Sequence, residues 1–170
     1  MNMQLRALRP AAAAALLAAL VTPAAWAADA KAEPVFGVQR LYLKELRIEQ
    51  PNSPAIFLDN DKTPQTDVKL NAGSEKIASE AYEGWVSITV THKINGKTAY
   101  IVMAKQAAIF DIKNIPTAQM APLLGIGLPN IVYPYLRANV ADAITRAGFP
   151  PVHLAEVNWE TYYKQQRAGK

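Results

Sequence analysis

Apolar and polar residues alternate most clearly at residues 85–94, whose sequence is WVSITVTHKI. In an extended chain this pattern places valine and isoleucine on one face and serine and threonine on the other. Asn95-Gly96 follows, a pair typical of the type I′ turn because both residues tolerate positive φ. The apolar stretch from Thr98 to Phe110 then predicts the returning strand. We therefore expect a β-hairpin in an antiparallel sheet that is covered on one side.

The segment from Val35 to Ile48 predicts a further strand with a less regular pattern. Its sequence, VFGVQRLYLKELRI, alternates in three short runs, and the phase slips twice between them. Such slips are typical of β-bulges, in which one strand carries an extra residue. Residues 50–67 indicate a loop around a brief apolar patch at 55–58, and Val68 and Leu70 indicate the start of a short strand.

The C-terminal half of the chain predicts the helices that cover the sheet. Met120–Leu136 is almost wholly apolar but is interrupted by prolines and glycines, so we expect two short helices joined between Gly125 and Pro129. Apolar residues continue at helical spacing until Ala147, and Gly148 then predicts the helix end. Asn158 is the expected N-cap of a last helix.

The same apolar segment bears on the class of protein. Its three prolines and two glycines would leave backbone groups without partners in a bilayer, which argues against membrane insertion. It also holds more apolar surface than one small sheet can cover. Surplus apolar surface of this kind predicts a subunit interface or an apolar binding groove.

The first 27 residues predict a secretory signal peptide. They begin with Arg6 and Arg9, continue through the apolar run Ala11–Val21, and end in the small-residue exit Ala25-Trp26-Ala27. The apolar run is shorter than the roughly 20 residues that a spanning helix needs, although a retained N-terminal anchor is an alternative. The rest of the chain is expected to comprise a tether (28–34), one folded domain (35–167) and a tail (168–170).

Composition excludes several kinds of chemistry. The chain has 18 basic and 14 acidic residues and no cysteine, so thiol catalysis, disulfides and thiolate metal sites are excluded. A small and scattered positive surplus predicts no nucleic-acid surface. His92 and His153 lack acidic residues at ligand spacing, and the glycines at 125 and 127 lack the third glycine of a nucleotide fingerprint. We therefore expect no metal, no cofactor and no enzymatic activity.

From about Phe36 to Gln166 the chain resembles the SecB-type protein-export chaperones. The resemblance is carried by VQRLYLKELRIEQPNSP from residue 38, IFDI from 109, TAQM from 117, LPNIVYPYLR from 128 and GFPPVHLAEVNW from 148. It implies an α+β fold, with a four-stranded antiparallel sheet and helices packed on one face, assembled as a dimer of dimers. It also implies an ATP-independent holdase for unfolded preproteins.

The resemblance assigns roles to three sets of residues. Client-binding residues in apolar grooves are Phe57, Val68, Leu70, Trp159 and Tyr163. Acids that would dock the translocase motor SecA are Glu45 and Glu49. Oligomer-interface residues are Val102, Ala104, Gln106, Met120, Leu124 and Tyr133. Ordinary core packing is the alternative for the first set, and a solvated strand edge is the alternative for the second.

The chain also departs from the family pattern. Met103 stands where another docking acid is expected and Lys105 lies beside it, which should weaken docking to a basic partner. The loop from Phe57 to Asp67 is longer than usual and lacks the family's tryptophan. The predicted signal peptide indicates a periplasmic holdase, whereas the family is cytosolic. The alternatives are a cytosolic SecB that delivers preproteins to SecA and an envelope adaptor that binds one folded partner.

Overall fold

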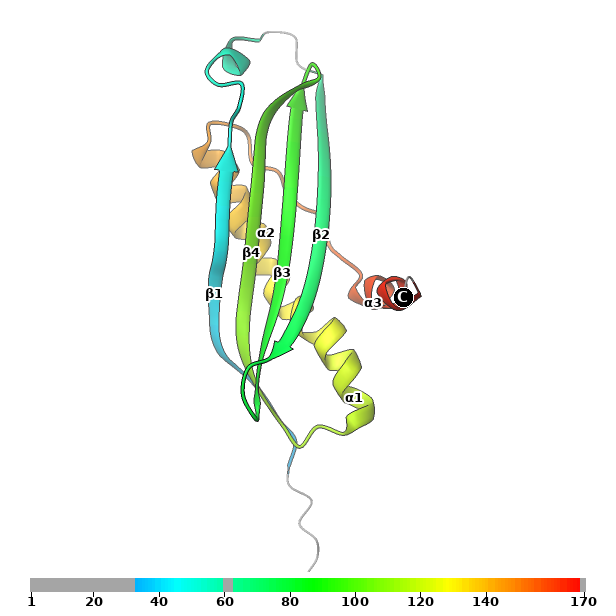
Figure 1. Ribbon diagram of the computed structural model, residues 1–170. Coiled ribbons are helices and arrows are strands. Elements are labelled where there is room, and N and C mark those ends of the chain that lie inside the picture. The colour runs from blue at the N-terminus through cyan, green and yellow to red at the C-terminus, as the bar shows by residue number, and fades with distance from the viewer. Residues whose placement is uncertain (1–32, 60–62, 169–170) are drawn as a thin grey trace, which may run out of the picture. The chain divides into compact units, whose positions relative to one another are not determined.

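The computed structural model describes residues 33–59 and 63–168. The predicted signal peptide, the start of the tether and the end of the tail therefore lie outside the described residues. The expected α+β fold is confirmed, with one four-stranded antiparallel sheet in the order β1-β4-β3-β2 (Figure 1). The strands are β1 (Val35–Glu49), β2 (Pro64–Lys76), β3 (Ala81–Ile94) and β4 (Lys97–Lys113).

The hairpin formed by β3 and β4 agrees with the prediction. Asn95 and Gly96 have φ angles of 50° and 77°, as a type I′ turn requires. The alternation along β3 buries Val86 and Val90 on one face, opposite Gln106 and Val102 of β4.

The two predicted bulges in β1 are also confirmed. The register against β4 shifts between Val38 and Arg40 and again between Leu43 and Glu45. Each shift brings the next apolar run of β1 back to the same face, so that Leu46 pairs with the buried Ala104. The irregular pattern in the sequence therefore encodes one continuous apolar face.

The strand predicted at Val68 and Leu70 is confirmed, but it is not short, and the prediction that residues 64–67 belong to the preceding loop was wrong. β2 has 13 residues and pairs with β3 along its whole length, from Pro64 opposite Ile94 to Lys76 opposite Tyr82. Its first residues are polar because the strand lies at the sheet edge, where side chains face solvent. Ala55–Leu58, the apolar patch before β2, forms the short 3₁₀ helix η1.

The two predicted short helices are not separated by a loop. α1 (Thr117–Pro122) continues into the π-helical segment η2 (Leu123–Gly127) and then into α2 (Leu128–Arg146). The amide of Leu128 donates to the carbonyl of Leu123, five residues back. The wider turn keeps the helix continuous despite its prolines, which is how π-bulges are commonly used.

The ends of the later helices follow the predicted signals. Gly148, with a φ angle of 88°, stands directly after the last turn of α2. α3 (Trp159–Ala168) begins after Asn158, whose side-chain oxygen accepts a hydrogen bond of 2.9 Å from the amide of Thr161.

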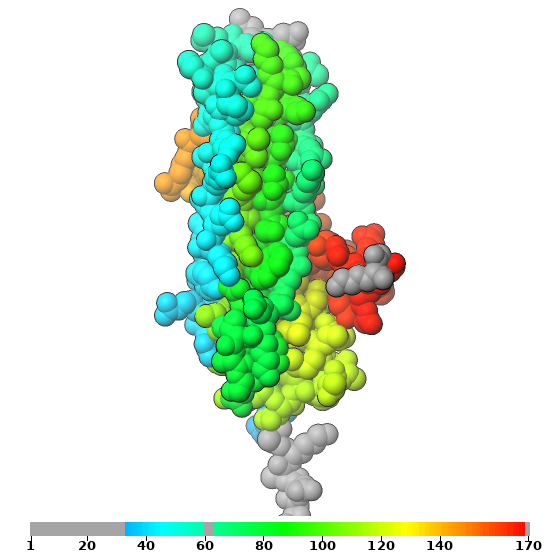
Figure 2. All heavy atoms as spheres, in the orientation of Figure 1, coloured from blue at the N-terminus to red at the C-terminus, as the bar shows by residue number. Residues whose placement is uncertain are grey.

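The elements form two layers. α2 lies on one face of the sheet, mainly against β3 and β4, and α3 lies beside β2 (Figure 1). The core is formed by fully buried side chains of α2, including Val132, Leu136 and Val140, packed on the sheet. The opposite face of the sheet, toward the viewer in Figure 2, is covered by no described helix. None of the helices in residues 33–59 and 63–168 has the length and apolarity to cross a membrane.

Candidate functional site

Three adjacent hollows follow β2 on the helix-bearing side of the sheet. We call them the upper, middle and lower hollow, and together the β2 groove. Their volumes are about 330, 280 and 170 Å³. β2 contributes Pro64 to the upper hollow, Val68 and Leu70 to the middle one, and Ala72 to the lower one. Alternate residues of a strand share one face, so these residues of β2 lie in one mostly apolar row along the groove, which the polar Thr66 interrupts between the upper and middle hollows.

Aromatic rings form much of the upper hollow. Phe57 stacks on Phe149 with 5.0 Å between ring centroids, and Phe149 packs on Tyr100 at 4.9 Å. Tyr100 in turn stacks on His92 at 4.9 Å. Phe57 is 45% exposed although it is large and apolar. Tyr100 is fully buried, so this hollow presents to solvent mainly the ring of Phe57, with the half-buried Phe149 behind it.

The middle hollow lies between β2, β3 and the segment that joins α2 to α3. Val68, which is 45% exposed, and Leu70 line it from the sheet. The hydroxyl of Tyr133 donates a 2.7 Å hydrogen bond to the carbonyl of Ala155, and this bond fixes the opposite wall. An ion pair between Arg137 and Glu156 ties the same segment to α2.

The lower hollow lies between the end of β2, η2 and α3. Tyr163 of α3 packs on Gly125, where an added Cβ would lie 2.3 Å from the tyrosine ring. Trp159 is only 4% exposed and does not line the groove. Its ring lies edge-on to Tyr133 and Tyr162, so it supports the groove from beneath.

The structure thus brings four of the five predicted client-binding residues to the β2 groove: Phe57, Val68, Leu70 and Tyr163. Their role in client binding stays a prediction. Sequence reasoning missed Tyr100, Phe149 and Val152, although Phe149 follows the predicted helix end as an isolated aromatic residue. Such a residue in a proline-rich connection is a signal that could have been used.

His92 should make the stability of the fold depend on pH. Burial lowers the pKa of His92 below its ordinary value of 6.5, while its Nδ1 lies 2.8 Å from the hydroxyl of Thr66. The lining of the upper hollow contains no other charged side chain. Because the unfolded chain takes up a proton at higher pH than the fold does, the free energy of unfolding should fall as pH drops through about 6.5.

The measurement is the urea midpoint at a series of values from about pH 8 to pH 5. We expect the midpoint to decline toward acid in the native protein, and His92→Gln to remove part of that decline. An unchanged decline in the variant would assign the pH dependence to another group.

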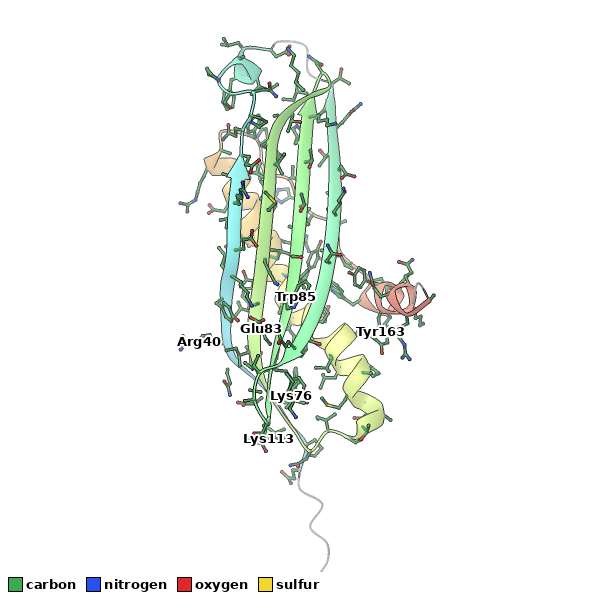
Figure 3. The ribbon with its side chains drawn as sticks, viewed as in Figure 1. Arg40, Lys76, Glu83, Trp85, Lys113 and Tyr163 are labelled. Carbon is green, nitrogen blue, oxygen red and sulfur yellow. The ribbon has the colours of Figure 1, made fainter. Side chains whose placement is uncertain are left out.

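The open face of the sheet carries a buried carboxylate (Figure 3). Glu83 is 6% exposed, and its two oxygens each lie 2.8 Å from Nζ of Lys44. Burial opposes ionisation of Glu83, but hydrogen bonds from Lys44 and Tyr42 outweigh it and lower the pKa of Glu83. Burial and the neighbouring carboxylate raise the pKa of Tyr42 to about 12. The group is therefore a stable ionised cluster joining β1 to β3.

The two predicted docking acids also face this side, but cations accompany them. Glu49 forms a 2.6 Å ion pair with Arg47, and Glu45 stands opposite Lys105 in the register of β1 and β4. Met103 stands opposite Arg47. These positions form no cluster of like negative charge. The role of Glu45 and Glu49 in docking stays a prediction.

The predicted oligomer-interface residues lie in two environments. Val102, Ala104, Gln106 and Tyr133 are buried within the single chain, and Gln106 accepts a 2.8 Å hydrogen bond from Asn139 of α2. Met120 and Leu124 are half-buried. The assignment of this set to an interface stays a prediction.

Nothing among the described residues resembles a metal site. Within 33–59 and 63–168, no three histidine, aspartate or glutamate side chains gather closely enough to hold an ion.

Comparison with known proteins supports the resemblance seen in the sequence. A family described as SecB, preprotein translocase subunit SecB, matches residues 29–170. The protein-export protein SecB of Herminiimonas arsenicoxydans is 58% identical over 139 residues, which cover 82% of this chain and 84% of that protein. The chain belongs to the SecB family. The SecB of Burkholderia vietnamiensis is 53% identical over 140 residues, covering 82% of this chain and 87% of that protein.

A solved structure agrees on the fold. The SecB-like chaperone of Mycobacterium tuberculosis, solved in complex with a ChAD peptide from an antitoxin, matches with a TM-score of 0.59 and 15% identity. The match covers 72% of this chain and 90% of that one. The SecB family is a family of protein-export chaperones that bind unfolded preproteins, and recognition of the family from the sequence is confirmed.

Proposed function

We propose that this chain is an ATP-independent holdase that keeps preproteins unfolded by binding them in the β2 groove. The observation that carries the proposal is the row of three apolar hollows along one strand, with Phe57 and Val68 exposed beside them. Large apolar side chains that remain in contact with water add little to the stability of the fold, and a group of them marks a binding surface. An extended client can cover them.

The energetics suit a binder that does not depend on sequence. Burying one large apolar side chain contributes about 1.5–3 kcal/mol, at about 25 cal/mol per Å². The upper hollow suits aromatic side chains of the client because its own rings can stack with them. The middle hollow suits aliphatic ones, since Val68, Leu70 and Ile88 line it. Most unfolded preproteins contain both kinds.

The test is suppression of aggregation. A denatured client diluted into buffer should scatter less light when the chaperone is present at about one oligomer per client, with no ATP added. A folded protein of similar size and charge serves as the control. Scattering that is unchanged by a stoichiometric amount of the chaperone would exclude the holdase.

We propose that the working form is a dimer of dimers. β1 is an edge strand whose apolar side chains are exposed in the single chain, as edge strands used for pairing are. These side chains are Val35, Phe36, Val38, Leu43, Leu46 and Ile48. Met120 and Leu124 add apolar surface on the helical side. Light scattering coupled to size-exclusion chromatography should give the mass of four chains, and a monomeric mass would contradict the proposal.

We propose further that the chain is exported and docks SecA weakly. The family match begins at residue 29, directly after the predicted cleavage region, which supports removal of the preceding segment. Arg47 and Lys105 beside the docking acids oppose binding to a basic partner. Mass spectrometry of the native protein should find Ala28 as its first residue. An intact N-terminus together with tight SecA binding would favour the cytosolic alternative.

A further inference from the structure

His92 is the residue of the upper hollow whose charge can change near neutral pH. The other described residues that line this hollow are apolar, apart from the hydroxyl of Tyr100. His92 is half-buried, so part of its ring remains open to the hollow. The ring stacks on Tyr100 with an angle of 12° between the two planes, and its Nδ1 lies 2.8 Å from the hydroxyl of Thr66. No other described residue bonds to the ring, so Nε2 is left for a bound side chain.

A positive charge on His92 would have no partner of opposite charge within the upper hollow. No carboxylate lines this hollow among the residues that the structure describes. Tyr100 is fully buried, and burial raises its pKa, so it stays neutral. Asp59 and Lys97 line a different, smaller hollow. Lys93 follows His92 in β3, so its exposed side chain lies on the other face of the sheet.

The two charge states of His92 therefore give the hollow two different chemistries. Burial lowers the pKa of His92, so the ring is neutral at neutral pH and becomes charged in mild acid. An apolar client side chain can cover the neutral ring at little cost. The same side chain would have to strip water from a charged ring, which opposes binding. A client carboxylate would instead supply the missing negative charge and accept a hydrogen bond from the ring.

We infer that His92 determines which client side chains enter the upper hollow. Apolar side chains enter while the imidazole is neutral, and acidic side chains are preferred once it is protonated. The inference rests on the proposed holdase function and adds a specificity that changes with pH. Acidification would then release a client that is anchored by an aromatic side chain, without ATP.

The test uses two client peptides that differ only at one anchoring residue, which is phenylalanine in one and glutamate in the other. Fluorescence anisotropy gives both affinities from about pH 8 to pH 5, a range in which the glutamate stays largely ionised. The ratio of the two affinities, phenylalanine over glutamate, should fall on the order of tenfold or more across this range. A ratio cancels any change of the protein that affects both peptides equally.

Two histidine variants locate the effect. His92→Gln keeps a polar side chain but cannot become charged, so the ratio should no longer change with pH. His153→Gln is the matched control, since it removes the other histidine of the chain, an exposed residue of the middle hollow, and should keep the fall. A constant ratio in the native protein, or a fall that persists in His92→Gln, would overturn the inference. Failure of the phenylalanine peptide to bind at pH 8 would count against the proposed function itself.

Nuclear magnetic resonance gives an independent readout on the imidazole. In the His153→Gln variant the only remaining histidine is His92, so its ring signals report its pKa directly. Coupling between two binding equilibria is reciprocal. Saturation with the phenylalanine peptide should therefore lower the pKa of His92, and saturation with the glutamate peptide should raise it. The same pKa in the two complexes would contradict the inference.

Discussion

Replacing Val68 with aspartate should weaken client binding by at least tenfold while leaving the fold intact. The substitution places a charge at the mouth of the middle hollow, where a bound apolar side chain would have to desolvate it. Val68 is partly exposed in the free protein, so the aspartate remains hydrated until a client arrives. Fluorescence anisotropy of a labelled unfolded client gives the affinity, and circular dichroism checks the fold.

Asn71→Asp is the matched control. Asn71 lies on the same strand, but its side chain faces the open side of the sheet, opposite Ser87. Both variants add one negative charge to β2, so a difference in client affinity between them is due to the position of the charge in the groove. Equal and small effects of the two variants would show that clients do not enter the middle hollow.

Replacing Gly125 with alanine should loosen α3 from the rest of the domain. An added Cβ would meet the ring of Tyr163 at 2.3 Å, and either the ring or the helix must move. Overpacking of this kind costs about 1–3 kcal/mol. Because α3 begins at Trp159, its loosening should expose that indole and shift its fluorescence to longer wavelength. Thermal unfolding followed by the same signal measures the loss of stability.

A second variant, Tyr163→Ala, tests whether the loss of stability comes from the contact between residue 125 and Tyr163. With Tyr163→Ala already present, the clash is removed, and Gly125→Ala should be neutral or stabilising by up to about 1 kcal/mol through helix propensity. A double-mutant cycle therefore predicts a change of sign. The same destabilisation in both backgrounds would place the strain elsewhere.

Local signals in the sequence predicted much of the fold. The Asn95-Gly96 turn, the two phase slips in β1 and the ends of the helices at Gly148 and Asn158 each depend on neighbouring residues. The residues that produce such a feature lie within it or next to it, so the local sequence is enough to predict it. The buried face of α2 was predictable in the same way, because its apolar residues repeat at helical spacing.

Features set by distant partners were missed. The first part of β2 is polar, and it is a strand because β3 offers a complete ladder to pair with. Two short helices joined between Gly125 and Pro129 were expected because prolines and glycines signal breaks. The π-helical turn that keeps the helix continuous has no recognisable sequence pattern. Tyr163 packing on Gly125 joins residues that are remote in sequence.

The candidate site was predicted in outline through the family resemblance. Phe57, Val68, Leu70 and Tyr163 do lie at the groove, whereas Trp159 is buried below it. The aromatic rings of Tyr100 and Phe149 come from a strand and from the segment after α2, and they meet only in the folded chain. The spacing of Tyr100 and Phe149 in the sequence gives no sign that their rings pack together.

The small volume of each hollow in the β2 groove limits how long a client can be retained. One subunit buries only a few client side chains in its three hollows, so a single contact should dissociate quickly. A long polypeptide that spans several subunits rebinds before it escapes, since each tethered segment stays at high effective concentration. The residence time of a client on the oligomer should therefore increase steeply with client length. A client that becomes compact as it folds would contact fewer subunits and would dissociate without ATP.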